Sequence, residues 1–290
     1  MAEPNEIGGI VNERFLDVDG SQVRYLHAGR GRGPALVLVH GLLGYSFSWR
    51  FAIPLLARQR EVFAIDMPGA GFTESPRVLD GRLAAAAKRL SRFMDAAGIG
   101  HCDLVGSSYG GTTALQLAAS EPGRIRTLSL VSPANPWSKI GRKRLGALRI
   151  PVVGWLFPKV ARRARFLHRY FVRRMYGDST RIAADTIQGY SLPLARKNTI
   201  EHAVKITQSW AEDMRKLQDD MPKARRIPAL IIWGNKDRLV DPASAEPLSR
   251  NFEMVKTIVL PGLGHLPYEE GPKEFCRPLL EFLQTHSPAG

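Results

Sequence analysis

Five short apolar runs, separated by helix-like sequence, constrain the fold of this chain more than any other feature. Each run is nearly continuous in apolar residues, as expected for a strand buried on both faces of a sheet. The runs are ALVLVHG (35–41), EVFAIDMPG (61–69), CDLVGSS (102–108), IRTLSLVSP (125–133) and PALIIWGNKD (228–237). Two more strands are expected around a turn at Asp19-Gly20, and another at 254–262. Strands that alternate with helices predict a doubly wound, mostly parallel sheet.

The alternation stops between about 134 and 227, where helical patterns occur without a strand run. We therefore expect an α/β core formed by residues 1–133 and 228–290, with a helical lid, residues 134–227, inserted after the strand that ends near 133. Open α/β sheets bind ligands at the carboxyl ends of their strands, so the lid would cover a site. The lid is strongly basic. Residues 137–226 hold 21 of the 41 lysines and arginines but 7 of the 27 aspartates and glutamates, which accounts for the net charge of +14.

Several protein classes are disfavoured by the sequence. No apolar run reaches the roughly 18–20 residues of a membrane helix, and the acidic N-terminus MAEPNEIGGIVNERF lacks the apolar segment of a signal peptide. The two cysteines, Cys102 and Cys276, fit neither a metal-ligand spacing nor a disulfide framework. No nucleic-acid-binding module is recognised, and basicity alone does not predict one. We expect a cytoplasmic protein that needs no metal and no cofactor.

The stretch LVGSSYGG (104–111) contains a candidate nucleophile. Gly106 and Gly110 frame a G-x-S-x-G motif centred on Ser108, whereas a motif centred on Ser107 would need glycines where valine and tyrosine stand. A serine on a tight strand-to-helix turn requires small neighbours, because the two backbones nearly touch there. Its hydroxyl then lies at a helix N-terminus, which favours developing negative charge. Ser107 is interpreted as a small filler or pocket-wall residue.

A serine nucleophile needs a base, and the base needs an orienting acid. Asp237 directly follows the strand run at 228–237, and His265 lies in the loop LPGLGHLPYEEGP after the last strand. The chain order Ser, Asp, His is the one that a nucleophile elbow of this kind uses. Asp241 is a competing acid, but Asp241-Pro242 begins a helix, and an N-cap role accounts for it. The candidate catalytic residues are Ser108, Asp237 and His265.

Hydrogen-bond donors for an oxyanion are expected at two backbone positions. The glycine of His40-Gly41 lets the chain turn sharply after the first buried strand, so that the N–H of Leu42 can point into the site. The second donor would be the N–H of Tyr109, one residue past the nucleophile. His40 itself is interpreted as a structural hydrogen-bonding residue.

Taken together, these motifs resemble the α/β-hydrolase family. VHGLLG, DMPGAGFTES, GSSYGG, LIIWGNKD and LPGLGHLPYEEGP occur in the family's order and spacing, and the resemblance covers about 14–133 and 228–285. It implies an eight-stranded sheet, the triad Ser108, Asp237 and His265, and a lid at about 134–227.

Within the family, the chain is most similar to the carboxylesterase and monoacylglycerol-lipase-like branch, which implies ester hydrolysis. Haloalkane dehalogenases and epoxide hydrolases have an aspartate where Ser108 stands. The carbon–carbon hydrolases of the meta-cleavage type use serine, but typically have Asn and Trp where this chain has Ser107 and Leu266. Those hydrolases and cofactor-free haloperoxidases stay open as alternatives. A ligand-binding receptor of the same fold also stays open, although all three triad residues are present.

The segment 158–178 is predicted to form one amphipathic helix, from Pro158 to Gly177. Its apolar face would hold Val160, Ala164, Leu167, Phe171 and Met175, and its basic face Arg162, Arg165, Arg169 and Arg173. Two interpretations stay open. The helix could cover the active site with its basic face in solvent, or the arginines could meet anionic lipid headgroups while Trp155, Leu156 and Phe157 insert.

Overall fold

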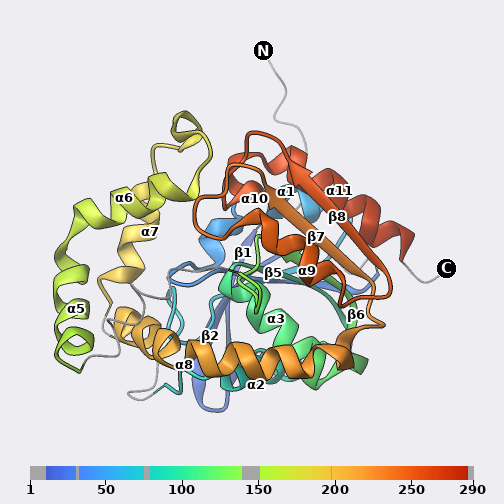
Figure 1. Ribbon diagram of the computed structural model, residues 1–290, viewed down its shortest axis with the longest axis horizontal. Helices are drawn as coiled ribbons and strands as arrows, with labels where there is room; N and C mark the ends of the chain where they lie inside the picture. Colours follow the sequence, from blue (N-terminus) through green and yellow to red (C-terminus); the bar gives the residue numbers. More distant parts are fainter. Residues whose placement is uncertain (1–10, 31–32, 75–78, 139–150, 197, 287–290) are drawn as a thin grey trace.

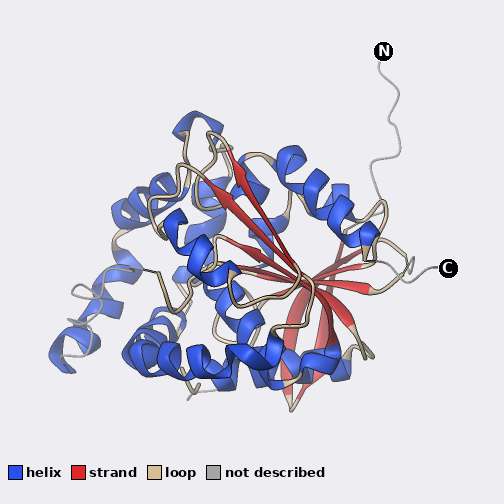
Figure 2. Ribbon diagram, turned by 45° about the vertical axis from the view of Figure 1, so that its right-hand side comes forward, coloured by secondary structure: helices blue, strands red, loops and turns tan. Residues whose placement is uncertain are grey.

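Eight strands form one twisted sheet in the computed structural model of the protein, which describes residues 11–30, 33–74, 79–138, 151–196 and 198–286 (Figure 1, Figure 2). The strand order is β1-β2-β4-β3-β5-β6-β7-β8. The strands are β1 (Asn12–Val18), β2 (Ser21–Ala28), β3 (Ala35–Val39), β4 (Val62–Ile65), β5 (Cys102–Ser107), β6 (Ile125–Val131), β7 (Ala229–Gly234) and β8 (Val255–Leu260). The β1–β2 and β2–β4 pairs are antiparallel, and all later pairs are parallel. The predicted fold class is confirmed.

Helices cover both faces of the sheet, which is why the parallel strands are apolar at nearly every position. On β3, Leu36 and Leu38 belong to one core cluster, while Val37 and Val39 belong to the other. The helices α2 (Leu83–Ala96), α3 (Tyr109–Ser120), α8 (Thr199–Asp220) and α9 (Ala245–Ser249) pack on the valine side. The helices α1 (Ile53–Leu56), α10 (Pro267–Glu270) and α11 (Pro272–Thr285) pack on the leucine side (Figure 1). Both layers fix where the carboxyl ends of the strands point.

The chain between β6 and β7 contributes helices but no strand among its described residues. It forms α5 (Pro151–Arg163), α6 (Arg165–Met175), α7 (Thr186–Leu194) and α8. Figure 1 shows α5, α6 and α7 at one side of the molecule, beyond the end of the sheet, whereas α8 runs back beneath it beside α2. We call α5–α7 and the first half of α8 the cap. Within the described part of the chain, no helix combines the length and apolar character needed to cross a membrane.

The prediction of a single helix over 158–178 is wrong. Pro158 lies inside α5, and the helix breaks at Ala164, whose ψ of 70° leaves the helical region. The break lets α5 pack against α8 while α6 packs against α7. Tertiary packing of two short apolar faces therefore outweighs the local periodicity that suggested one helix. Between β3 and β4 the chain forms a 3₁₀ turn at Ser46–Trp49, followed by the single helical turn α1.

Candidate active site

Ser108 lies on a sharp turn between β5 and α3, with φ 53° and ψ −120°. This left-handed conformation is strained for a residue with a side chain, and such strain costs about 1–3 kcal/mol. The surrounding backbone holds the residue in place. The Ser108 N–H donates to Val131 O at 2.9 Å, and the Ser108 carbonyl accepts from the Ala134 N–H at 3.2 Å. Both bonds join the turn to the end of β6, so the strain is maintained by the sheet.

The two framing glycines are required by close packing of the backbone. A Cβ on Gly106 would overlap the Gly110 carbonyl, and a Cβ on Gly110 would overlap the His40 carbonyl. The strand, the helix and the loop after β3 therefore meet at the nucleophile without room for a methyl group. This is the physical reason for the G-x-S-x-G spacing in this chain.

A buried carboxylate and imidazole form a hydrogen-bonded pair at the ends of β7 and β8. His265 Nδ1 lies 2.7 Å from Asp237 Oδ2. Both carboxylate oxygens of Asp237 accept further hydrogen bonds. Its Oδ2 also accepts from the indole N–H of Trp233 at 3.0 Å, and its Oδ1 accepts from the backbone N–H groups of Leu239 and Val240 at 2.8 and 3.1 Å. The carboxylate thus receives four hydrogen bonds and can rotate little.

These contacts determine the ionisation of the pair. Burial by itself raises the pKa of Asp237, but the adjacent His265 and the hydrogen bonds from His265, Leu239 and Val240 outweigh burial and lower the pKa from its ordinary value. An ionised carboxylate only accepts, so the proton of the neutral imidazole must reside on Nδ1. The lone pair on Nε2 of His265 is left free to act as a base.

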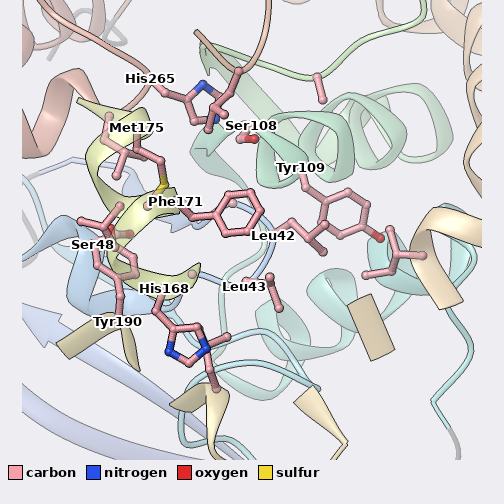
Figure 3. A pocket seen from close by; sticks show the side chains of 18 of the residues that line it. Leu42, Leu43, Ser48, Ser108, Tyr109, His168, Phe171, Met175, Tyr190 and His265 are labelled. Carbon is pink, nitrogen blue, oxygen red and sulfur yellow. The ribbon is translucent and has the colours of Figure 1, made fainter. Parts of the chain in front are cut away.

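Ser108 and His265 both line the same pocket. Figure 3 shows the imidazole of His265 above the Ser108 hydroxyl, with Tyr109 and Leu42 farther along the same wall. The structure therefore brings together the three residues predicted as a triad, which come from the ends of β5, β7 and β8.

His40 fixes the peptide that links Gly41 to Leu42, whose N–H is one of the two predicted oxyanion donors. The ring Nδ1 of His40 lies 2.8 Å from Gly41 O, and its Nε2 accepts the Met67 N–H at 3.0 Å. Nδ1 must therefore donate, and burial lowers the pKa of His40, which keeps the ring neutral. In a trans peptide the N–H points opposite to the C=O. Because His40 holds the Gly41 carbonyl, the Leu42 N–H is turned the other way.

Gly41 itself lies against the nucleophile. A Cβ placed on Gly41 would be 3.0 Å from Ser108 Cβ and 3.6 Å from its hydroxyl oxygen. Leu42 and Tyr109 both line the pocket beside Ser108. Tyr109 begins α3, so its N–H has no acceptor within the helix and is available to a ligand. The two predicted donors thus lie in the turn after β3 and at the start of α3.

The pocket is a cavity of about 340 Å³ between the strand ends and the cap. Its described lining contains no aspartate, glutamate, lysine or arginine, and two histidines, His168 and His265, are its only imidazoles. On the cap side, α6 contributes Leu167, Phe171 and Met175. These three belong to the apolar face predicted for the helix over 158–178, whereas Val160, predicted on the same face, is 54% exposed.

Comparison with known proteins agrees with this geometry. The model of the α/β hydrolase fold family matches residues 34–272. The chain belongs to the α/β-hydrolase fold family. The resemblance drawn from the motifs is therefore confirmed.

Relatives within the family have different activities. The chain is 28% identical to the dihydrolipoyllysine-residue acetyltransferase component of the acetoin cleaving system of Pseudomonas putida, over 93% of this chain and 69% of that protein. It is 28% identical to the 2-hydroxy-6-oxo-6-(2'-aminophenyl)hexa-2,4-dienoic acid hydrolase of Metapseudomonas resinovorans, over 95% and 92%. It is 24% identical to the monoacylglycerol lipase ABHD6 of Rattus norvegicus, over 93% and 84%. These three relatives are named for different activities, so membership of the family does not by itself identify the substrate.

The loop that carries His265 in this α/β-hydrolase is fixed by a glutamate that the sequence analysis did not single out. Glu270 is buried, and its carboxylate accepts from the N–H groups of Gly264, Gly177 and Asp178 at 2.6, 3.0 and 2.8 Å. The His265 N–H also donates to Met175 O at 2.6 Å. The loop is therefore bound to the C-terminal end of α6 as well as to α10.

We expect Glu270→Gln to lower kcat by about 10- to 100-fold, because a catalytic group displaced by about 1 Å loses that much rate. Glutamine can keep the two bonds at one oxygen but must turn its NH₂ toward a backbone N–H. KM should change little, because Glu270 does not line the pocket. The measurement is steady-state kinetics on a chromogenic ester, together with the rate at which a fluorophosphonate labels Ser108.

The matched control is Glu274→Gln, the same change at an exposed glutamate of α11. It should leave both rates within twofold of the parent. If Glu270→Gln lowers only the unfolding temperature, and the folded enzyme keeps its kcat and labelling rate, then Glu270 is structural and does not position His265.

The residues predicted to form an interfacial surface have different environments. Arg169 and Arg173 are exposed, and Trp155 is 64% exposed with the Lys159 ammonium 3.2 Å from its ring centre. Phe157 is 38% exposed and also lines the pocket.

The prediction that four arginines share one exposed face is wrong for Arg162, because that side chain pairs with Glu201 of α8 at 3.1 Å. The tertiary contact between α5 and α8 supplies this carboxylate, which the periodicity of the lid sequence could not indicate. The side chain of Arg165 lies outside the described residues.

Proposed function

We propose that this protein hydrolyses carboxylic esters with an apolar acyl chain through an acyl-enzyme on Ser108. The observation that carries the proposal is that the residues needed for acyl transfer lie around the same pocket. Ser108, His265, Leu42 and Tyr109 all line one apolar pocket, and Asp237 binds the Nδ1 side of His265. These are the groups that acyl transfer needs: a nucleophile, a base and donors for the oxyanion.

In the acylation step, Ser108 Oγ attacks the ester carbonyl carbon, and its proton passes to His265 Nε2. Asp237 stabilises the imidazolium through the Nδ1–H bond. The carbonyl oxygen becomes an oxyanion and accepts hydrogen bonds from the Leu42 and Tyr109 N–H groups. When the tetrahedral intermediate collapses, the C–O bond to the alcohol breaks, and the alcohol leaves with the proton from His265.

In the deacylation step, water attacks the acyl-enzyme carbonyl and gives its proton to His265 Nε2. The same two N–H groups hold the second oxyanion. Collapse of this intermediate breaks the bond to Ser108 Oγ, which takes back the proton, and the carboxylic acid leaves. The ester and one water are consumed, and the chain's own residues supply the nucleophile, the base and the oxyanion donors.

The uncharged lining favours a neutral ester over the acid named for the relative from Metapseudomonas resinovorans. A carboxylate brought into this pocket would find no lysine or arginine among the described lining residues. Burial of an unpaired charge is strongly unfavourable. An acyl chain is stabilised by the same lining, at about 0.8 kcal/mol for each methylene that leaves water. Monoacylglycerols, the substrates named for the rat relative, carry such a chain and no charge.

A panel of substrates tests the proposal. We expect kcat/KM for p-nitrophenyl esters to rise from acetate toward medium and long chains, by up to roughly fourfold for each buried methylene. A monoacylglycerol should also be hydrolysed. A carboxylate-bearing dienoate of the meta-cleavage type should be turned over far more slowly, and a haloperoxidase assay without cofactor should give no product.

The outcome that would overturn the proposal is a dienoate kcat/KM above that of every ester. Flat kcat/KM across the ester series would contradict the assignment of the apolar pocket to the acyl chain. The Ser108→Ala variant, assayed in parallel, measures the background rate for each substrate.

A further inference from the structure

The outer side of α5 and α6 exposes several large aromatic and aliphatic side chains. Phe166 is 73% exposed, Trp155 64% and Tyr170 53%. We call these three, together with Leu156, Val160, Lys159, Arg169 and Arg173, the α5–α6 surface. Clusters of exposed apolar side chains mark interaction sites when they form a contiguous patch. Figure 1 shows both helices at the periphery of the molecule, where an extended partner can approach.

The charge of this segment is of one sign. Residues 151–176 contain seven lysines and arginines and no aspartate or glutamate. The spacing interleaves cations and apolar groups on each helix. Trp155 lies one turn from Lys159, and Phe166 and Tyr170 lie one turn apart beside Arg169 and Arg173. A second copy of the chain would be repelled by such a surface, whereas an anionic partner would be attracted.

Two side chains of α5 and α6 are exposed and also line the pocket. Phe157 of α5 and Phe171 of α6 line the cavity above Ser108, yet they are 38% and 52% exposed. Figure 3 shows Phe171 projecting across the pocket from α6. A lipid held against α5 and α6 would therefore lie near two rings that line the pocket.

We propose that the α5–α6 surface binds an anionic phospholipid bilayer, with Trp155 and Phe166 inserted among the headgroups and Arg169 and Arg173 paired with lipid phosphates. Aliphatic Leu156 and Val160 offer no ring for a nucleobase to stack on, so the mixture of groups suits a bilayer better than a nucleic acid. Delivery of a lipid ester to the pocket rests on the proposed function, but the binding itself does not.

The test is flotation of the full-length Ser108→Ala protein with vesicles, which measures binding without turnover. We expect vesicles of phosphatidylcholine mixed with phosphatidylglycerol to bind the protein, and vesicles of phosphatidylcholine alone to bind it at least tenfold less. Binding should weaken as NaCl rises from about 50 to about 500 mM, because salt screens the attraction.

Two double variants measure separately how the basic and the aromatic side chains contribute to vesicle binding. Arg169→Glu with Arg173→Glu should lower partitioning by about thirtyfold or more, since each basic residue near an anionic surface contributes about 1 kcal/mol. Trp155→Ala with Phe166→Ala should lower it at least tenfold. The matched controls are Lys273→Glu with Arg277→Glu on α11, which makes the same charge change elsewhere, and Phe15→Ala on β1, which removes a ring that is 53% exposed. Both controls should bind as the parent does.

Equal binding to neutral and anionic vesicles at low salt would overturn the proposal. So would full binding by the aromatic double variant, or tighter binding to a single-stranded oligonucleotide than to vesicles. With Ser108 intact, the arginine variant should hydrolyse a short soluble ester at the parent rate, and a matching loss there would assign the arginines to the active site. Because vesicle binding needs no catalysis, failure of ester hydrolysis would leave this test intact.

Discussion

Ser108→Ala should lower the kcat for ester hydrolysis by about 10⁴- to 10⁶-fold, because it removes the covalent route. The oxyanion donors and the pocket remain, so KM should stay measurable and the residual rate should exceed that in water. The measurement is hydrolysis of the best p-nitrophenyl ester, together with loss of fluorophosphonate labelling.

Ser107→Ala is the matched control, since it removes the same atom one residue earlier. Ser107 ends β5 with its side chain fully buried, and its hydroxyl lies beside that of Tyr268. It is therefore turned toward the core, and the variant should keep at least about a third of the activity. A dead Ser107→Ala enzyme with an active Ser108→Ala enzyme would show that the register of the motif is wrong.

The strain at Ser108 adds a stability readout to this experiment. Glycine adopts the φ of 53° without cost, whereas alanine does not. Ser108→Gly should therefore be as inactive as Ser108→Ala but more stable, by about 1 kcal/mol in the free energy of unfolding. Equal stability of the two variants would mean that the turn stores no strain.

The fold could be predicted because its main signal is local. A strand buried on both faces is a short continuous apolar run, and runs such as 35–41 and 102–108 coincide with β3 and β5 to within two residues. The cap is harder to predict from the sequence, because the bend at Ala164 depends on the helices against which α5 and α6 pack. No feature of residues 158–178 alone reveals those partners.

In the candidate site, too, some residues could be predicted from the sequence and others depend on tertiary contacts. Ser108 directly follows β5, and Asp237 and His265 lie in the loops after β7 and β8, so the parallel topology brings all three to one edge of the sheet. Trp233 lies four residues before Asp237 on the same strand end, and that spacing could have indicated a donor to the carboxylate. Glu270 could not be assigned in this way, because one of its partners, Gly177, is 93 residues away and belongs to the cap.

Asp237→Asn should lower kcat/KM by about 10³- to 10⁴-fold, because it imposes the wrong imidazole tautomer. All four partners of Asp237 are donors, so the new NH₂ must face two of them. On the Oδ1 side the NH₂ would face two backbone N–H groups, which can only donate and therefore cannot bond to it. On the Oδ2 side His265 can respond by moving its proton to Nε2 and accepting at Nδ1. The second arrangement is the less unfavourable one, and it leaves Nε2 unable to take the Ser108 proton.

The matched control is Asp241→Asn, the same change four residues later. Asp241 is exposed and accepts from the Ala243 N–H at 2.9 Å as the cap of a 3₁₀ turn. Asparagine caps as well as aspartate, so activity should stay within twofold and stability within about 0.5 kcal/mol. Proton NMR gives an independent readout. The low-field signal of an imidazole N–H bonded to a carboxylate should be present in the parent and in Asp241→Asn, and absent in Asp237→Asn. Retention of that signal with lost activity would contradict the tautomer argument, and equal loss of activity in both variants would contradict the assignment of Asp237 as the acid.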